Sequence, residues 1–331
     1  MPILTSTLSP LTRLTTKTFA KPLSPIHRHL APMSQTRSLS LSSYFITPAD
    51  LSTALPTKPS TKISTAPRII PLCASWFLPN EPQARTGLSV YKHSHIPTAR
   101  FFDLDAIRDP TSPYPHMLPP AAAFAKAMRE MGINKDDTVI IYDSTELGLF
   151  SAPRVGWTFK VFGHPSVHIL NNYRLWVEQG YTTESGEPAP VGEGEMGNYP
   201  EPEVDMQKIA SFEEMKDVAQ EYGKDSSQGI QILDARPYGR WAGTAPEPRP
   251  GLSSGHMPSS ISIPHSELLD AKTGTLLPRE ELRRIFEAKG VDPERPIVSS
   301  CGTGVTAAVV DAALEEAEWG MGRRVYDGSW T

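Results

Sequence analysis

The sequence predicts an α/β fold made of two similar units, each with a parallel sheet flanked by helices. Two observations carry this prediction. Short apolar runs rich in β-branched residues alternate with amphipathic helical patterns, as is typical of parallel sheets covered by helices. The same order of features also occurs twice within the 331 residues, and that length is about twice the size of a typical domain.

The internal repeat consists of an opening segment, a histidine followed two residues later by proline, and a strand-like run with a polar residue directly after it. In the first unit these landmarks are 45–51, His95 and Asp143. In the second unit they are 209–215, His256 and Cys301. The histidine precedes the polar residue by 48 residues in one unit and by 45 in the other. We therefore expect two homologous units.

The elements of the second unit can be assigned in order from their hydrophobic periodicity. The expected elements are a strand at 231–234, a helix at 278–289, a strand at 297–298, a helix at 306–317 and a strand at 324–326. In the first unit, 138–142 is the strand that corresponds to 297–298. Ligands of such sheets bind beyond the carboxyl ends of the strands, and Cys301 falls at one of these ends.

The ends and the middle of the chain differ from the two units. The first 49 residues contain no Asp or Glu but five Lys and Arg, which is typical of a mitochondrial transit peptide, with a disordered tail as the alternative. Translation from Met33 would leave a cytoplasmic form. We place the limits at 1–43 for the transit peptide, 44–182 for the first unit, 183–205 for an exposed linker rich in glycine and proline, and 206–331 for the second unit.

Composition excludes several classes of protein. A net charge of −5 gives no electrostatic footprint for nucleic acid or anionic membranes, so direct nucleic-acid binding is not expected. No apolar run approaches the roughly 18 residues that a membrane-spanning helix needs. The two cysteines, Cys73 and Cys301, are too few for a disulfide framework, and Cys73 lies in a strand pattern that predicts burial.

Cys301 is the candidate nucleophile. A strand that turns through Cys301-Gly-Thr-Gly-Val-Thr306 into a helix points backbone N–H groups and the positive end of the helix dipole at the sulfur. This environment stabilises a thiolate, which is the reactive form of cysteine. Gly302 and Gly304 allow the backbone to approach the sulfur closely. The alternatives are a buried structural cysteine and a phosphatase loop, but Ala307 stands where a phosphatase has its phosphate-binding arginine.

These features together resemble the rhodanese family of sulfurtransferases. The resemblance covers the chain from Tyr44 onward and rests on the Cys301 loop, 234–249 (DARPYGRWAGTAPEPR), 254–258 (SGHMP), 326–330 (YDGSW), 74–76 (ASW), 150–155 (FSAPRV) and 162–164 (FGH). It implies two tandem rhodanese-like domains, each a mostly parallel five-stranded sheet flanked by helices. The first would be non-catalytic, because Asp143 replaces the cysteine. Relatives usually continue beyond 327–330 (DGSW), so we expect the second domain to be truncated at its C-terminus.

The resemblance also implies a reaction. The loop after Cys301 contains no Lys or Arg and is similar to that of 3-mercaptopyruvate sulfurtransferases. Thiosulfate enzymes typically carry Arg-Lys at this place. We expect sulfur to pass from the donor to Cys301 as a persulfide, with release of pyruvate, and then to thioredoxin, another thiol or cyanide. No metal or organic cofactor is implied, and a monomer or weak dimer is expected. The alternatives are a thiosulfate sulfurtransferase, a persulfide carrier for tRNA thiolation, and a non-catalytic binding module.

The site residues follow from the match to the family. Catalytic roles are implied for Cys301, for Thr303 as the hydroxyl group and for His95 as the histidine coupled to it, with Glu81 the nearest acidic residue before His95. The expected donor-binding residues are Arg240, Arg249, Gly302, Gly304, Val305 and Thr306, the two arginines being suited to a carboxylate. Asp234 and Arg236 are expected to form a structural pair, and His256 to have a structural role.

Overall fold

The computed structural model describes residues 41–55, 67–189, 196–221, 223 and 229–331. The predicted transit peptide therefore lies almost wholly outside the described residues. Within these residues, no helix is long and apolar enough to cross a membrane.

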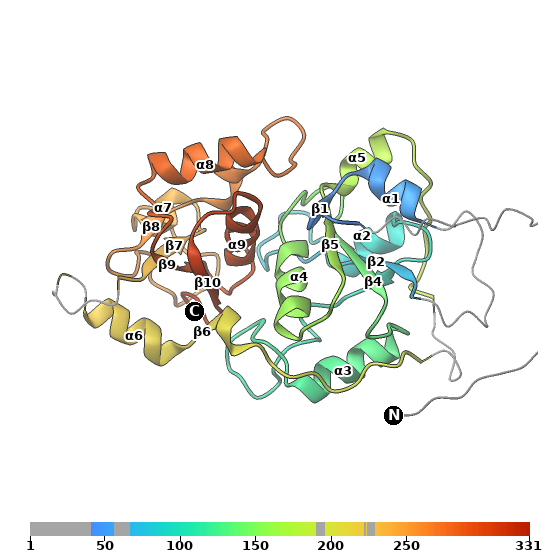
Figure 1. Cartoon of the computed structure of the whole chain (residues 1–331), viewed down its shortest axis with the longest axis horizontal. Coiled ribbons are helices and arrows are strands. Elements are labelled where there is room, and N and C mark those ends of the chain that lie inside the picture. The colour runs from blue at the N-terminus through green and yellow to red at the C-terminus, as the bar shows by residue number, and fades with distance from the viewer. Residues whose placement is uncertain (1–40, 56–66, 190–195, 222, 224–228) are drawn as a thin grey trace, which may run out of the picture. The chain divides into compact units, whose positions relative to one another are not determined.

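The first repeat contains a five-stranded parallel sheet with the strand order β1-β5-β4-β2-β3. Its strands are β1 (Phe45–Ile46), β2 (Ile69–Cys73), β3 (Arg100–Phe101), β4 (Thr138–Tyr142) and β5 (Val167–Leu170). Its helices are α1 (Pro48–Ala54), α2 (Gly87–His93), α3 (Ala121–Glu130), α4 (Ala152–Val161) and α5 (Tyr173–Glu178). The helices flank the sheet on both sides (Figure 1).

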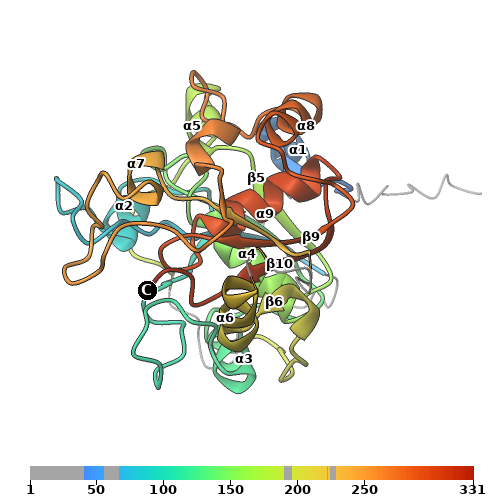
Figure 2. The same ribbon diagram turned by 90° about the vertical axis from the view of Figure 1, so that its left-hand side faces the viewer.

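The second repeat has the same topology, with the strand order β6-β10-β9-β7-β8 and only parallel pairs among the named strands. Its strands are β6 (Ile209–Ala210), β7 (Gln231–Asp234), β8 (Ile261–Ser262), β9 (Pro296–Ser300) and β10 (Met321–Tyr326). Its helices are α6 (Phe212–Gln220), α7 (Tyr238–Trp241), α8 (Arg279–Ala288) and α9 (Ala307–Glu316), with 3-10 turns η2 (Met206–Lys208) and η3 (His265–Leu268). Figure 2 shows α9 running along this sheet. The predicted α/β class is confirmed, as are the predicted elements of this repeat.

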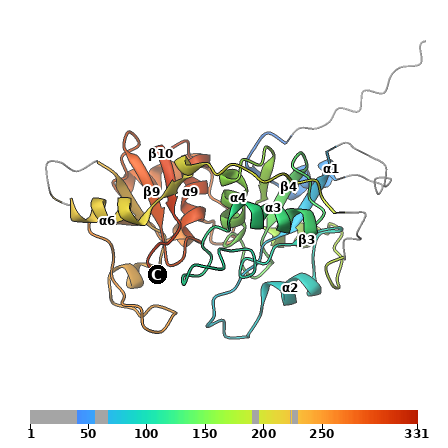
Figure 3. The same ribbon diagram turned by 90° about the horizontal axis from the view of Figure 1, so that it is seen from below.

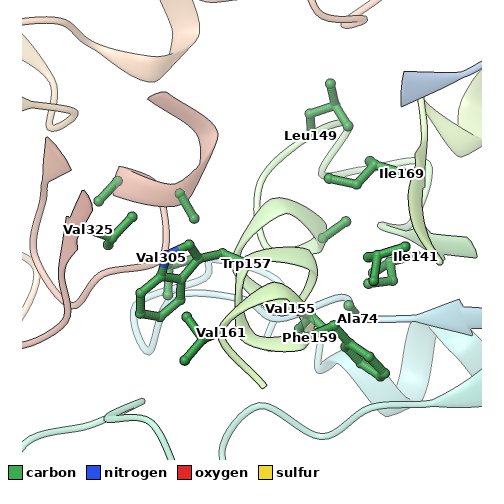
Figure 4. Packing of buried hydrophobic residues seen from close by; sticks show 14 of the residues in the cluster. Ala74, Ile141, Leu149, Val155, Trp157, Phe159, Val161, Ile169, Val305 and Val325 are labelled. Atoms are coloured by element: carbon green, nitrogen blue, oxygen red, sulfur yellow. The ribbon is translucent and has the colours of Figure 1, made fainter. Parts of the chain in front are cut away.

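Helix α4 is the central element of the contact between the repeats. Every residue of α4 except Lys160 is buried, because one side of the helix covers its own sheet and another packs against α9. A helix that is buried all round needs apolar residues on every face, and α4 meets this condition with few exceptions. In Figure 4 the Trp157 side chain points away from Val155 and toward Val305, so one apolar cluster continues from the first repeat into the second.

Two further segments cross between the repeats. The loop that precedes α3 runs toward the C-terminal end of the chain (Figure 3), where the backbone N–H of Leu118 donates to Asp327. On another side, Asn171 accepts a hydrogen bond from Leu276 N and Asn172 donates one to Thr273 O. The segment at Asp327 and the segment 273–276 of the second repeat are thus hydrogen-bonded to the first repeat.

The connecting segment is mostly exposed where the structure describes it, but one part of it differs from the sequence expectation. An exposed linker was expected over 183–205, but Tyr199 is only 1% exposed and packs edge-on against Phe124. Its hydroxyl also bonds to His164 Nδ1. A single aromatic residue therefore anchors the connection to the first repeat, and the general polarity of the segment concealed this contact.

Candidate active site

Cys301 follows β9, which is the central strand of the second sheet, and the loop after it leads directly into α9. The side chain is buried, with 2% of its surface exposed. The loop places Gly304 at φ +74°, a conformation that favours glycine. The structure thus places Cys301 at the carboxyl edge of a parallel sheet, as the sequence predicts, in the loop that leads to α9 at Ala307.

Ser329 fixes the backbone of this loop from the C-terminal motif. Its hydroxyl oxygen accepts hydrogen bonds from the N–H groups of Cys301 and Gly304, each at 3.0 Å, and donates to the carbonyl oxygen of Tyr326. The N–H of Trp330 in turn donates to Cys301 O. The segment after β10 therefore supports the loop from behind and leaves the other side of Cys301 facing a pocket.

The pocket in front of Cys301 has a volume of about 100 Å³ and is lined by both repeats. First-repeat residues Trp76, Leu78 and Phe150 form an apolar wall. The second repeat supplies the polar side and the loop: Arg236, Pro237, Arg240, Pro248, Arg249, His265, Cys301, Gly302, Thr303, Val305 and Thr306. Of the predicted site residues, the structure brings all but His95 and Gly304 to this lining.

Thr303 is coupled to a histidine of the first repeat, but that histidine is His116. Its Nδ1 atom lies 3.1 Å from Thr303 Oγ1, and its Nε2 atom lies 3.0 Å from Asp105 Oδ1. Because a carboxylate can only accept, Nε2 carries the proton and Nδ1 of the neutral ring accepts from the Thr303 hydroxyl. Burial lowers the pKa of His116 below its usual 6.5, although Asp105 opposes the shift. His116 is therefore a neutral acceptor for the Thr303 proton.

The prediction of His95 as the catalytic histidine is corrected by this geometry. The His95 ring stacks on Tyr91 at 4.1 Å, its Nδ1 bonds to Tyr91 O, and its backbone forms a β-bridge with Glu184. His256 in the second repeat makes a similar stacking contact and hydrogen bond with Trp241, at 4.1 Å between rings and 2.9 Å between Nδ1 and the carbonyl oxygen. The two histidines thus share a structural role that closes a turn.

The acidic partner also differs from the sequence assignment. Glu81 is occupied by Arg85 in a local ion pair, whereas Asp105 makes the hydrogen bond to His116. That hydrogen bond lowers the pKa of Asp105, so the carboxyl group is ionised. Trp76 also donates to Asp105 from its indole N–H, at 3.0 Å. An acid-histidine-hydroxyl chain therefore exists, but its acid and its histidine come from the loop after β3.

The pocket arginines form a charged network with different degrees of pairing. Arg236 is bound by Asp234 and by Glu247, and the predicted structural pair with Asp234 is confirmed. Glu247 also accepts from Nε and Nη2 of Arg240. Arg249 makes no hydrogen bond or ion pair with any residue that the structure describes, and burial lowers the pKa of its guanidinium. Arg249 is thus the arginine in the pocket that retains an unneutralised charge.

In the first repeat, the loop at Asp143 that corresponds to the Cys301 loop has a structural role. The carboxylate of Asp143 accepts hydrogen bonds from the N–H groups of Phe150, Ser151 and Ala152 and so caps α4. Cys73 is buried as expected, and burial raises the pKa of its thiol to about 12, which removes the thiolate. Within the described residues, Cys301 is the cysteine placed for chemistry.

Sequence reasoning missed His116, Asp105, Ser329 and Glu247. Ser329 lies in the motif 326–330 and Glu247 in the motif 234–249, and a polar residue in a family motif is itself a signal. His116 and Asp105 lie in a segment without regular secondary structure, and the histidine motif of the repeat drew the assignment to His95 instead. That motif occurs in both repeats, which should have indicated a structural role.

Comparison with protein families and curated sequences places the chain among sulfurtransferases. The model described as "Rhodanese-like domain" matches residues 214–331. A probable 3-mercaptopyruvate sulfurtransferase of Schizosaccharomyces pombe is 41% identical over 271 residues, which is 80% of this chain and 86% of the relative. The thiosulfate sulfurtransferase TUM1 of Saccharomyces cerevisiae is 37% identical and is covered over 88% of its length by 80% of this chain.

Solved structures give the same result. The 3-mercaptopyruvate sulfotransferase SseA of Escherichia coli has a TM-score of 0.72 at 33% identity, with 88% of this chain and 100% of that chain covered. The sulfur transferase subunit found sub-stoichiometrically in yeast mitochondrial complex I has a TM-score of 0.73 at 34% identity, with 87% and 95% covered. Similar proteins thus include a mitochondrial one.

Proposed function

The chain belongs to the rhodanese family of sulfurtransferases, and from this membership we propose that it transfers sulfur from 3-mercaptopyruvate to a thiol through a persulfide on Cys301. The observation that carries the proposal is one pocket in which Cys301 faces Arg240 and Arg249. Mercaptopyruvate has a carboxylate beside a ketone, and planar guanidinium groups suit both acceptors.

The first half of the reaction transfers one sulfur atom. The Cys301 thiolate attacks the donor sulfur, so that an S–S bond forms while the C–S bond breaks. The electron pair of the C–S bond passes to carbon, giving the enolate of pyruvate, and the donor thiol proton ends on that carbon. The Thr303 hydroxyl, with neutral His116 behind it, is placed to carry this proton. Pyruvate leaves and Cys301 holds the outer sulfur.

The second half of the reaction returns the enzyme to its starting state. A thiol such as reduced thioredoxin, or cyanide in an assay, attacks the outer sulfur and releases the Cys301 thiolate. The backbone around Cys301 is already fixed by Ser329, so the loop need not rearrange between the two halves. This gives ping-pong kinetics with no organic cofactor or metal in the proposed cycle.

The preference for mercaptopyruvate over thiosulfate follows from where the cations lie. The loop 302–306 contains no Lys or Arg, and Glu247 neutralises much of the charge of Arg236 and Arg240. A dianion such as thiosulfate therefore meets one unpaired guanidinium, that of Arg249, among the described pocket residues. Thiosulfate sulfurtransfer is the second candidate, because TUM1 carries that name.

The experiment that tests this function compares two donors. We expect the purified protein to turn over mercaptopyruvate with a dithiol much faster than thiosulfate with cyanide, and Cys301→Ser to abolish both activities. Mass spectrometry of the intact protein after mercaptopyruvate alone should show a gain of about 32 Da, one sulfur atom, that is absent in Cys301→Ser. Equal or faster turnover of thiosulfate would overturn the donor assignment, and a missing adduct would overturn the persulfide.

Domain limits and location belong to the same proposal. We assign 44–182 to a non-catalytic rhodanese-like domain, 183–205 to the connecting segment and 206–331 to the catalytic domain. We also propose mitochondrial import through 1–43, with a cytoplasmic pool translated from Met33. Fusion of 1–43 to a fluorescent protein, compared with a version in which its basic residues are replaced by Gln, tests the import signal.

A further inference from the structure

Arg154 of α4 is a first-repeat residue whose guanidinium group reaches the catalytic loop of the second repeat. The side chain is 1% exposed. Nη2 donates to His116 O at 2.6 Å and to Asp327 Oδ1, and Nη1 makes a longer contact of 3.4 Å with Gly304 O. The guanidinium carbon also lies 4.6 Å from the centroid of the Trp157 ring. One buried cation thus joins three segments that are far apart in sequence.

Two of these segments contain the partners of the hydrogen bond between His116 and Thr303, and the third supports them. His116 belongs to the loop that supplies the acceptor, and Gly304 is the neighbour of Thr303, which supplies the hydroxyl. Asp327 is held in turn by the N–H of Leu118, which is two residues beyond His116. Arg154 is therefore bonded to the backbone of His116 on one side of this contact and lies near the backbone of Gly304, next to Thr303, on the other.

We propose that Arg154 is a positioning residue for sulfur transfer: it locks His116 of the first repeat against Thr303 of the second without touching the donor. Arg154 does not line the donor pocket, so its contribution passes through the two residues that it holds. This inference rests on the proposed function and assigns a positioning task to the repeat that lacks the nucleophile.

The surroundings of Arg154 indicate a fixed arrangement. A Cβ atom at Gly304 would lie 2.6 Å from Arg154 Nη1, so only glycine lets the guanidinium approach the loop this closely. The helix that carries Arg154 is capped by the buried carboxylate of Asp143. A buried guanidinium that is paired with a carboxylate is strongly held, because loss of either partner leaves an unpaired buried charge.

Arg154 also acts on His116 through its charge. The ionisable groups that influence His116 are Asp105, which raises the pKa, and Arg154 and Arg249, which lower it after burial. Removal of the Arg154 charge should therefore raise the pKa of His116 and move the acid limb of the pH–rate profile to higher pH. A side chain that only stabilised the fold would leave that limb in place.

The test uses the full chain with two substitutions at Arg154. Arg154→Met removes the charge and all hydrogen bonds, while Arg154→Lys keeps the charge but loses the planar fork. For Arg154→Met we expect kcat with mercaptopyruvate to fall about 100-fold, as a displacement of roughly 1 Å in a catalytic group can produce, with KM within about 3-fold of the parent. For Arg154→Lys we expect a smaller loss, of about 10-fold, and an unchanged acid limb.

Arg68→Met is the matched control. Arg68 also belongs to the first repeat and pairs with a buried carboxylate, that of Asp137, and it bonds to Gly132 O, outside the pocket lining. We expect it to lower the melting temperature and leave kcat unchanged. The proposal is overturned if folded Arg154→Met keeps kcat within about 3-fold of the parent. A loss of kcat with the acid limb unmoved would also overturn it.

Two remaining outcomes are also decisive. If Arg154→Met does not fold, Arg154→Lys decides alone: an unchanged kcat overturns the proposal, and a loss at constant KM supports it. If the parent protein transfers no sulfur, the proposed function itself is wrong. If the parent is active but substitution of Arg154 leaves kcat unchanged, only the role of Arg154 is wrong.

Discussion

The Nδ1 atom of His116 lies 3.1 Å from the Oγ1 atom of Thr303, although the two residues are 187 positions apart and belong to different repeats. The contact means that neither repeat holds a complete site. The nucleophile and the hydroxyl come from the second repeat, and the proton acceptor with its carboxylate comes from the first. Asp143 stands where the second repeat has Cys301, and the first repeat contributes His116 and Asp105 to the contact instead.

His116→Asn and His95→Asn test this assignment with the same substitution. Asparagine can imitate the Nδ1 position of either ring, so each variant can keep one hydrogen bond, but at 116 it cannot take up a proton. We expect His116→Asn to lower kcat about 100-fold, the lower range for loss of a general acid–base group. His95→Asn should lose the stacking on Tyr91 and hence some stability, with kcat within about 3-fold of the parent.

Steady-state kinetics and thermal unfolding of both variants give the answer. A larger kcat loss for His95→Asn than for His116→Asn would restore the histidine that the sequence indicates. It would also mean that the contact with Thr303 has no part in the reaction.

Much of the fold was predictable because it depends on local patterns. Residues 139–142 are all hydrophobic, as a strand buried on both faces must be, and the loop at Cys301 is defined by glycines at fixed positions. His116 has no such pattern. It lies in a segment without helix or strand, at φ +63°, and its position is set by Arg154, Asp105 and Thr303 from elsewhere in the chain. Tertiary contacts of this kind leave no periodic trace in the sequence.

The internal repeat already indicated a structural role for His95, although the match to the family indicated a catalytic one. His95 and His256 occur at equivalent places, yet a reaction at one loop needs one histidine. Each stacks on an aromatic ring and bonds through Nδ1 to the carbonyl oxygen of that aromatic residue, which gives both a structural role. Asp143 and Cys301 are more informative, because they occupy equivalent places in the two repeats but differ in chemistry.

The pH dependence of His116 gives a second prediction. Burial holds its pKa below 6.5, so the ring should stay neutral at pH 7 and become protonated only as the pH falls through that lowered value. The proton-acceptor function, and with it kcat/KM, should be lost in that acidic range. An NMR titration of the His116 ring, assigned with His116→Asn, measures the pKa directly. A value above 6.5 would contradict the neutral acceptor.

Asp105→Asn extends this prediction. Asp105 raises the pKa of His116, so its replacement should move the ring titration to still lower pH. It also removes the carboxylate that keeps the proton on Nε2, and the rate at neutral pH should therefore fall about 10-fold. An unchanged titration with a reduced rate would show that Asp105 acts only on the geometry.

Glu247 controls how much positive charge the donor meets. Its carboxylate binds both Arg236 and Arg240, and only 2% of it is exposed. Glu247→Gln keeps the shape but releases positive charge, which favours a dianion more than a donor with a single carboxylate. We expect the ratio of kcat/KM for mercaptopyruvate to that for thiosulfate to fall about 10-fold. Glu214→Gln, which breaks an ion pair with Arg324, is the control and should leave the ratio unchanged.

The two glycines beside Thr303 should respond differently to alanine. At Gly304 the residue is at φ +74°, and a Cβ atom would lie 2.6 Å from Arg154 Nη1 and 2.9 Å from Asp327 O. We expect Gly304→Ala to lower the free energy of unfolding by about 2 kcal/mol or more, from backbone strain and overpacking, and to lower kcat as well. Denaturant unfolding and steady-state kinetics measure the two effects.

In Gly302→Ala the new methyl group contacts a different side chain, so a comparison with Gly304→Ala separates effects on stability from effects on donor binding. Its Cβ atom would lie 3.2 Å from the end of the Arg240 side chain, which is flexible, and its φ is not in the left-handed region. The free energy of unfolding should change by less than about 1 kcal/mol. KM for mercaptopyruvate should rise, because Arg240 must move within the donor pocket. Equal stabilities of the two variants would mean that Arg154 yields to the new methyl group, which the buried pair with Asp327 should prevent.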